Sequence, residues 1–137
     1  MTNTGNKHTV LFNEVIERLD NTAFGKYDLI VGISSGGIVP ASLAAYKLKT
    51  DLKIIKINFR DELNNPRYDE PRILDEFEMP AGVKTLLLVD DVSVTGSTLD
   101  KAKSLLGNYD ITTLVMKGKG DFVLFPEIKT CVNWPWK

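Results

Sequence analysis

Runs of consecutive apolar residues alternate with helical patterns along this chain, and this alternation constrains the fold more than any other feature. Apolar runs typical of buried strands lie at 27–33, 52–59, 83–89 and 111–116. Stretches with apolar residues at helical spacing lie at 8–20, 38–48 and 98–108. Strands that alternate with helices predict crossover connections. We therefore expect an α/β fold with a mostly parallel central sheet flanked by helices.

Two further segments complete the expected organisation. The tail over 122–137 should hold one or two more short strands, and the polar, proline-bearing stretch over 60–82 is the one long loop. Loops of this length in a compact domain are usually functional or mobile. In the helix over 8–20 we expect Thr9 to be the N-cap. The apolar face of that helix should be formed by Leu11, Val15 and Leu19.

The composition fits one globular domain. The chain has 137 residues, of which 43% are hydrophobic and 26% are charged, enough to bury a core. Its net charge of −1 gives no basic field that would favour nucleic acid as a partner. A single cysteine excludes an intramolecular disulfide and favours a reducing compartment. No apolar run approaches the roughly 20 residues of a membrane span, so we expect a cytoplasmic protein without a membrane partner.

Small and charged residues follow three of the predicted strands. SSGG at 34–37 follows the first strand, DDVSVTGST at 90–98 the third, and KGKG at 117–120 the fourth. In parallel sheets, ligands bind beyond the carboxyl ends of the strands. Because three such groups coincide at one expected edge, the sequence predicts a binding site there.

The segment VTGST at 94–98 has the composition of an anion cradle. Gly96 allows backbone N–H groups to approach a ligand closely, and the hydroxyls of Thr95, Ser97 and Thr98 add donors. The helix that begins near Thr98 adds unpaired N–H groups and the positive end of its dipole. No lysine follows Gly96, which excludes a P-loop of the ATP-binding type. The segment suits a phosphate monoester, although a plain helix N-cap would use the same residues.

Two acidic residues, Asp90 and Asp91, stand between the third strand and this cradle. Carboxylates beside a phosphate site can hold a ribose 5-phosphate by its 2- and 3-hydroxyls. They can also lie near Mg²⁺ through water, because Mg²⁺ keeps much of its hydration shell. Adjacent strand residues point to opposite faces, so the two acids should not share one role equally. The plain alternative is a pair of solvated acids at a strand end.

The stretch LLLVDDVSVTGSTL at 86–99 resembles the 5-phosphoribosyl-1-diphosphate (PRPP) signature of type I phosphoribosyltransferases. VGISSGGIVPA at 31–41 looks like the pyrophosphate loop of that family, which often contains a cis peptide bond. Lys117 matches the lysine that purine-type members use against the exocyclic oxygen of the base. CVNWPWK at 131–137 resembles the hood of the small xanthine- and guanine-type enzymes.

The resemblance implies a domain organisation and an activity. The type I phosphoribosyltransferase fold would form a single domain over 1–137, with a flexible active-site loop at 60–82 and a hood at 120–137. The activity would be transfer of 5-phosphoribose from PRPP to a ring nitrogen of a nucleobase, in a Mg²⁺-dependent homodimer. Pyrophosphate and a nucleoside monophosphate would be the products.

Residue roles also follow from the resemblance. Asp90 and Asp91 would be the catalytic residues and would hold Mg²⁺. The PRPP-binding residues would be Ser34, Ser35, Gly36, Gly37, Asp90, Asp91, Val92, Ser93, Val94, Thr95, Gly96, Ser97 and Thr98. The base-binding residues would be Lys117, Val132 and Trp134. The loop would exclude water and offer the diphosphate Arg60, Arg67 or Arg72.

Two residues depart from the family pattern. Ser35 stands where the family usually has an arginine, whose charged hydrogen bonds contribute roughly 1.5–3 kcal/mol each. Diphosphate binding should therefore be weaker or depend on a loop arginine. Val94 stands where 6-oxopurine enzymes have an aspartate that exchanges a proton with the base, help typically worth about 10²–10⁴-fold. Lys117 still favours a carbonyl-bearing purine, so we expect a 6-oxopurine while the choice of base stays open.

Two other functions fit parts of the sequence. A catalytically silent protein of the same fold that senses PRPP or a nucleotide would explain Ser35 and Val94. A nucleotide-binding protein of another class would use Asp90 and Asp91 as phosphoacceptor or metal ligands, which the segment TGST fits poorly. The intact ribose-phosphate segment favours the enzyme.

Overall fold

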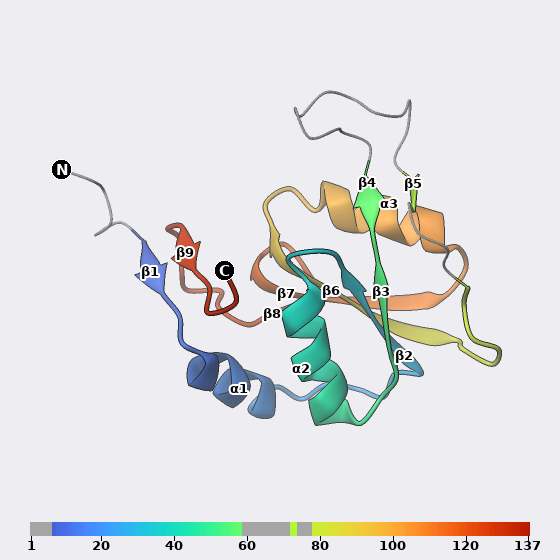
Figure 1. Cartoon of the computed structure of the whole chain (residues 1–137), viewed down its shortest axis with the longest axis horizontal. Coiled ribbons are helices and arrows are strands. Elements are labelled where there is room, and N and C mark those ends of the chain that lie inside the picture. The colour runs from blue at the N-terminus through green and yellow to red at the C-terminus, as the bar shows by residue number, and fades with distance from the viewer. Residues whose placement is uncertain (1–6, 59–71, 74–77) are drawn as a thin grey trace.

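A parallel five-stranded sheet forms the centre of the molecule (Figure 1). The computed structural model describes residues 7–58, 72–73 and 78–137. In spatial order, the central strands are β3 (Leu52–Ile55), β2 (Leu29–Ile33), β6 (Thr85–Ser93), β7 (Asp110–Gly118) and β8 (Phe122–Val123). The helices within the described ranges are α1 (Phe12–Asp20), α2 (Ile38–Leu48) and α3 (Ser97–Leu106). The expected α/β fold with a parallel central sheet is confirmed.

Both faces of the sheet are covered, which explains the continuous apolar runs. Side chains alternate along β6: Leu87 joins a core with α1, α2 and the tail, whereas Leu88 joins a core with α3. All five residues of β2 are buried for the same reason. None of the helices in the described ranges is long and apolar enough to cross a membrane.

The first helix differs from its prediction at its beginning. α1 starts after Leu11, so Thr9 is not its N-cap, because His8–Thr9 form the short strand β1. Leu11 is 55% exposed, whereas Val15 and Leu19 are buried, so the buried face is narrower than expected. The other two helices agree with their predictions, and α3 ends at Gly107 as its C-cap.

The strand predicted over 52–59 is broken. After β3 the chain leaves the central sheet, and β4 (Ile57–Asn58) pairs antiparallel with β5 (Arg72–Ile73). The stretch predicted as one loop over 60–82 therefore contains a strand. Residues 59–71 and 74–77 lie outside the described residues, so the expected closure of this loop and two of its arginines, Arg60 and Arg67, lie there as well.

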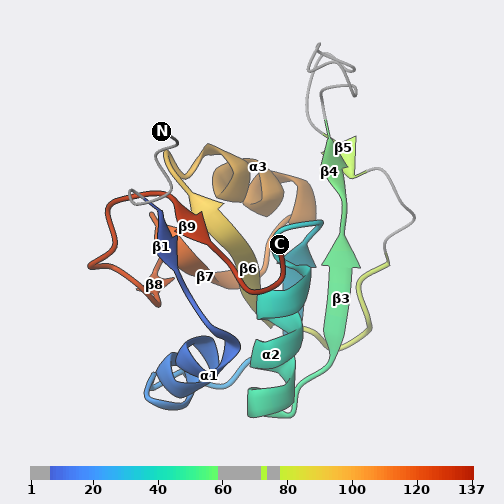
Figure 2. The ribbon, with the colours of Figure 1, turned by 60° about the vertical axis from the view of Figure 1, so that its left-hand side comes forward.

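The tail makes two short strands, within the range expected. β8 adds to the edge of the central sheet, and β9 (Val132–Asn133) pairs in parallel with β1. Figure 2 shows β1 and β9 side by side, and the end of the chain running from β9 to the start of α2. The two rings of Trp134 and Trp136 stack with their centroids 5.4 Å apart and an interplanar angle of 6°.

Candidate functional site

The two acids lie inside a strand and not beyond its end. β6 continues through Asp90 and Asp91 to Ser93, because this stretch pairs with β7 as far as Gly118. Asp90 is 9% exposed and Asp91 is 8% exposed. The alternative of solvated acids at a strand terminus is therefore wrong. Burying a carboxylate costs free energy unless it is paired. The groups that contact the two acids therefore belong to the site.

Asp91 touches two other parts of the molecule. Its Oδ1 accepts a hydrogen bond from the N–H of Val92 at 2.7 Å, and its Oδ2 lies 2.9 Å from Nζ of Lys137. Its carboxyl group also lies against Gly36, where an added Cβ would stand 2.5 Å from Cγ and both oxygens. Asp91 therefore joins β6 to the loop over 34–37 and to the tail.

The two acids differ in their affinity for a proton. Burial raises the pKa of Asp90 to about 7, and the negative charge of Asp91 adds to this. Burial also acts to raise the pKa of Asp91, but hydrogen bonds from Lys137 and from the N–H of Val92 outweigh it and leave that pKa below its usual value. Near neutral pH, a proton on this pair therefore resides on Asp90.

The loop over 34–37 packs directly against the strand ends. The N–H of Ser34 donates to the carbonyl of Ile55 at 2.8 Å, and the N–H of Gly37 donates to that of Ile33 at 2.8 Å. A Cβ on Gly37 would stand 2.5 Å from the carbonyl oxygen of Val89. The peptide bond between Ser34 and Ser35 is cis, as the resemblance implied.

The segment over 94–98 forms an exposed turn into α3. Gly96 is the N-cap and has φ +85°, a left-handed conformation that favours glycine. The N–H of Ser97 donates to Oγ1 of Thr95 at 3.2 Å. Within the described part of the chain, no backbone or side-chain acceptor meets the N–H groups of Thr95 and Gly96. Together with the positive end of α3, these N–H groups suit an anion, and we call the segment over 94–98 the cradle.

The end of β7 holds the cradle in place. Gly118 has φ +108°, and a Cβ there would collide with the backbone of Ser93. The N–H of Lys119 donates to the carbonyl of Ser93 at 2.7 Å. Sequence reasoning singled out the segment KGKG at 117–120 but gave Gly118 no role of its own. A cavity of about 240 Å³ lies on the α3 side of this contact and reaches Thr95 and Gly96.

The three predicted base-binding residues lie at or near the tail. Nζ of Lys117 donates to the carbonyl of Thr130 at 2.7 Å, so its ammonium faces the segment before β9. Val132 is partly buried in β9. Trp134 is 4% exposed, and its ring packs between Phe125, at 5.7 Å between centroids, and Trp136. This packing favours a structural role for Trp134 over stacking on a base.

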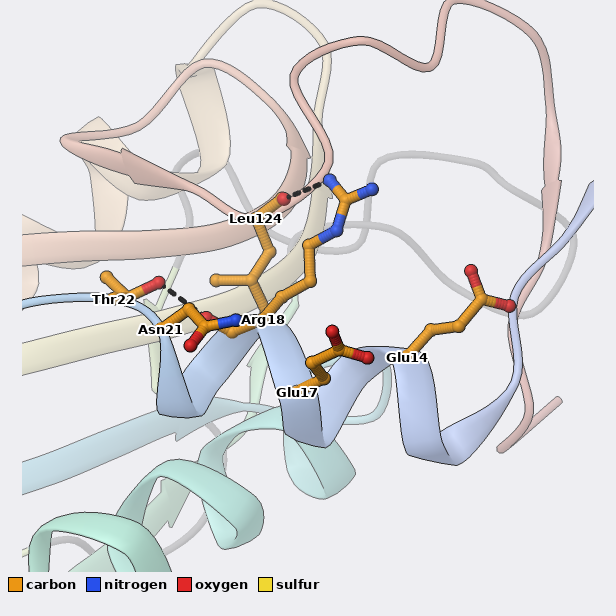
Figure 3. Close-up of a pocket in the computed structure, with 6 residues that line it drawn as sticks. All are labelled: Glu14, Glu17, Arg18, Asn21, Thr22 and Leu124. Atoms are coloured by element: carbon orange, nitrogen blue, oxygen red, sulfur yellow. Dashed lines mark hydrogen bonds between the residues drawn. The ribbon is translucent and has the colours of Figure 1, made fainter.

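A second hollow, of about 360 Å³, lies between α1 and the tail, away from the strand ends (Figure 3). Arg18 dominates it: its Nη1 donates to the carbonyl of Leu124 at 2.9 Å, and its guanidinium pairs with Glu127 at 2.6 Å. The guanidinium also lies over the ring of Phe125, 4.3 Å from its centroid. These contacts fasten the tail to α1, so we assign this hollow a structural role.

The chemistry of the site follows from its donors. Two acids stand between a glycine-rich loop at 34–37 and an anion cradle at 94–98, which suits a molecule that carries a diol between two phosphate groups. The described residues contain no group of three or more His, Cys, Asp and Glu that could hold a metal ion. A divalent cation here would need oxygens of a bound molecule or water, as Mg²⁺ commonly does.

Comparisons with solved structures agree with this geometry. The purine phosphoribosyltransferase from Pyrococcus horikoshii Ot3 matches with a TM-score of 0.78 and 25% sequence identity, over 96% of this chain and 95% of that chain. The xanthine-guanine-hypoxanthine phosphoribosyltransferase from Helicobacter pylori has the same fold, with a TM-score of 0.69 and 15% identity over 95% and 92% of the two chains. The expected type I phosphoribosyltransferase fold is confirmed.

Comparisons of sequence extend the similarity. An orotate phosphoribosyltransferase from Sulfurisphaera tokodaii is 31% identical over 96 residues, which make up 70% of this chain and 43% of that protein. The transcriptional regulator GfcR from Methanocella arvoryzae is 26% identical over 95 residues, 68% of this chain and 45% of that protein. This chain spans less than half the length of these two curated relatives. Residues 7–134 match the family described as "Phosphoribosyl transferase domain", so the chain belongs to this family and has a fold like that of its purine phosphoribosyltransferases.

Proposed function

We propose that this chain transfers 5-phosphoribose from PRPP to a ring nitrogen of a nucleobase and releases pyrophosphate. The observation that carries the proposal is the buried pair Asp90 and Asp91, set between the loop over 34–37 and the cradle over 94–98. A new bond forms from the nitrogen to C1 of the ribose, and the bond from C1 to the diphosphate oxygen breaks with its electron pair. The nitrogen then loses a proton to solvent.

Each part of the donor molecule has a matching part of the site. The cradle over 94–98 takes the 5-phosphate on free N–H groups and hydroxyls, because a phosphate at a helix start is favoured by the dipole. Asp90 and Asp91 accept hydrogen bonds from the ribose hydroxyls. Ser34 to Gly37 face the diphosphate, where glycines let the backbone approach. Val92 and Ser93 join the acids to the cradle, which begins at Val94.

A magnesium ion fits this donor set. Asp90 and Asp91 would supply oxygen ligands, and the remaining ligands would be water and oxygens of the donor. When bound, Mg²⁺ would neutralise negative charge that develops on the departing diphosphate. Asp90 must lose its proton before it can bind the metal ion or accept hydrogen bonds on both carboxylate oxygens.

We propose a 6-oxopurine as the base. Lys117 can donate to a carbonyl oxygen from its position at the end of β7, and the similarity to a purine phosphoribosyltransferase supports this choice. Val94 is 77% exposed and cannot exchange a proton with the base. The orotate phosphoribosyltransferase among the relatives makes orotate the first competitor, because orotate also carries ring carbonyl groups.

A catalytically silent sensor of PRPP or a nucleotide is the second candidate function. Ser35 and Val94 remove a charge and a proton acceptor that catalysis would use, and one of the relatives is a transcriptional regulator. Such a protein would keep the cradle and the acids while losing turnover.

A base panel separates the two functions. The chain is incubated with PRPP, MgCl₂ and one of adenine, guanine, hypoxanthine, xanthine, uracil or orotate, and pyrophosphate release is followed with a coupled assay. We expect the largest rate with a 6-oxopurine and no release without added base. Binding of PRPP by calorimetry without turnover of any base would favour the sensor. An absence of PRPP binding would refute the enzyme, and an absence of binding of both PRPP and nucleoside monophosphates would refute the sensor as well.

A homodimer and a cytoplasmic location are part of the proposal, and both are carried over from the resemblance and the composition. Light scattering coupled to size exclusion tests the first, with a mass of about twice 15.3 kDa expected. Fractionation of cells that express the chain tests the second.

A further inference from the structure

Lys137 is held beside the acids by the packing of the tail. β9 pairs with β1, Trp134 and Trp136 stack on each other, and the N–H of Lys137 donates to the carbonyl of Trp134 at 3.2 Å. The backbone at Lys137 is therefore fixed by neighbours that lie outside the site. Figures 1 and 2 both draw the end of the chain near the loop that joins β2 to α2.

The ammonium of Lys137 stands where the acids meet the loop over 34–37. Its Nζ lies 2.9 Å from Oδ2 of Asp91, and the carboxyl group of Asp91 lies against Gly36. A group bound at the loop over 34–37 would therefore lie within a short swing of this side chain. Among the ion pairs that the described residues make, this is the one that reaches the acids.

The loop over 34–37 has no charge of its own. It consists of two serines and two glycines, and Ser35 stands where the family resemblance implies an arginine. A diphosphate bound there by neutral donors alone would be held weakly, since charge-assisted hydrogen bonds are roughly twice as strong as neutral ones. A cation from another part of the chain would remove this deficit.

The side chain of Lys137 is free to change partners. It is 58% exposed, whereas the side chain of Asp91 is 11% exposed. Lysine carries its charge on a flexible four-carbon stem with three donors, so its ammonium can turn without movement of the backbone. A divalent cation at the acids would compete with the ammonium for Asp91, and a diphosphate beside it would offer a new anionic partner.

We propose that Lys137 binds the diphosphate group of the phosphoribosyl donor and supplies the positive charge that the loop over 34–37 lacks. In the free chain its ammonium pairs with Asp91, and in the complex it donates to diphosphate oxygens. This inference rests on the proposed function. It goes further by assigning the charge to a residue of the tail.

Calorimetry with two ligands tests the assignment. Inorganic pyrophosphate with MgCl₂ reports on the diphosphate end, and ribose 5-phosphate reports on the cradle and the acids. For Lys137→Gln we expect pyrophosphate binding to weaken at least tenfold and ribose 5-phosphate binding to change less than twofold. Lys137→Arg should restore pyrophosphate binding to within about threefold, because it keeps the charge. Lys129→Gln is the matched control, since Nζ of Lys129 donates to the carbonyl of Pro126 and should leave both affinities unchanged.

The outcomes separate this inference from the proposed function. Unchanged pyrophosphate binding in Lys137→Gln, or an equal loss for both ligands, overturns the assignment while the donor site stands. Tighter pyrophosphate binding also overturns it, because Lys137 would then only shield Asp91. If the unaltered chain binds neither ligand, the proposed function fails and the assignment fails with it. A thermal melt of each variant checks that the fold is kept.

Discussion

The two loops that flank the acids both depend on glycine, but for different reasons. At 34–37 the glycines are crowded: an added Cβ on Gly36 would stand 2.5 Å from the carboxyl group of Asp91. At 94–98 nothing lies within 4 Å of a Cβ on Gly96, but its φ of +85° disfavours other residues. One loop therefore needs glycine for space and the other for conformation.

The two loops should therefore differ in how well they tolerate substitution of their glycines. At Gly36 the neighbouring carboxyl group of Asp91 cannot easily move away from an added methyl group, because Val92 and Lys137 hold it in place. A left-handed position costs roughly 1–2 kcal/mol for an ordinary residue and can still form. The loop over 34–37 is therefore expected to be the more fragile part of the donor site.

Gly36→Ala should have the largest effect. The new methyl group must displace the carboxyl group of Asp91, so we expect pyrophosphate binding to weaken at least a hundredfold. The free energy of unfolding should fall by about 1–3 kcal/mol, the usual cost of overpacking. Calorimetry with pyrophosphate and MgCl₂ and a urea titration measure the two quantities. A variant that binds pyrophosphate normally would show that Gly36 has room, contrary to the packing described above.

Asp90→Asn should change how stability depends on pH. The pKa of Asp90 is about 7 in the folded chain and near 3.8 when unperturbed, so its contribution to stability is complete below about pH 4. As the pH rises to about 7, the unfolded chain loses this proton first, and the free energy of unfolding falls. Each unit of pKa difference is worth about 1.36 kcal/mol. Asp90→Asn should therefore be more stable than the unaltered chain at pH 8, by about 4 kcal/mol, and equally stable at pH 4.

Urea titrations at pH 4 and pH 8 measure this difference, with Asp91→Asn as the matched variant. The pKa of Asp91 is lowered, so its contribution is present above its usual value and is lost as the pH falls below it. Asp91→Asn should therefore destabilise the chain at pH 8, the opposite sign. The same sign for both variants would contradict the division of roles between the two acids. Both variants should lose binding of ribose 5-phosphate.

Gly96→Ala should have a smaller effect than Gly36→Ala and should act on the other ligand. The strain of a left-handed alanine should lower the free energy of unfolding by about 1 kcal/mol. Binding of ribose 5-phosphate should weaken severalfold, because the turn presents the N–H groups of the cradle. Pyrophosphate binding should stay within twofold. Gly96→Asn, which tolerates this conformation better, should recover part of the loss, and equal losses in both variants would point to a clash instead of strain.

Much of this site could be predicted from local sequence. The run before Asp90, the glycine in TGST and the helix after it are signals that lie within fourteen residues, and strand and helix both form there. The continuation of β6 through the acids could not be read locally, because it depends on pairing with Lys117 and Gly118 of β7. From the local sequence alone, Asp90 and Asp91 indicate the end of a strand.

The contacts of the tail could not be predicted from local sequence. Lys137 meets Asp91 only because β9 pairs with β1 across more than a hundred residues of sequence, and this pairing also removed the N-cap expected at Thr9. The burial of Trp134 comes from the same closure, with Phe125 and Trp136 as neighbours. Strands as short as β1 and β9 show too little periodicity in their sequences for their pairing to be predicted from sequence patterns.

Removal of the contact between Arg18 and Glu127 tests whether the position of Lys137 depends on the attachment of the tail to α1. The guanidinium of Arg18 lowers the pKa of Glu127 to about 2, but both side chains are well exposed, so the pair is worth little. Glu127→Gln should lower the free energy of unfolding by about 0.5 kcal/mol at pH 7. The difference from the unaltered chain should shrink as the pH falls from about 4.5 toward 2, because the unfolded chain takes up the proton of Glu127 first. Urea titrations at pH 7 and pH 2.5 measure it. Pyrophosphate binding should not change, since Trp134 and β9 still fix the tail, and a loss of binding would mean that Lys137 is positioned through α1.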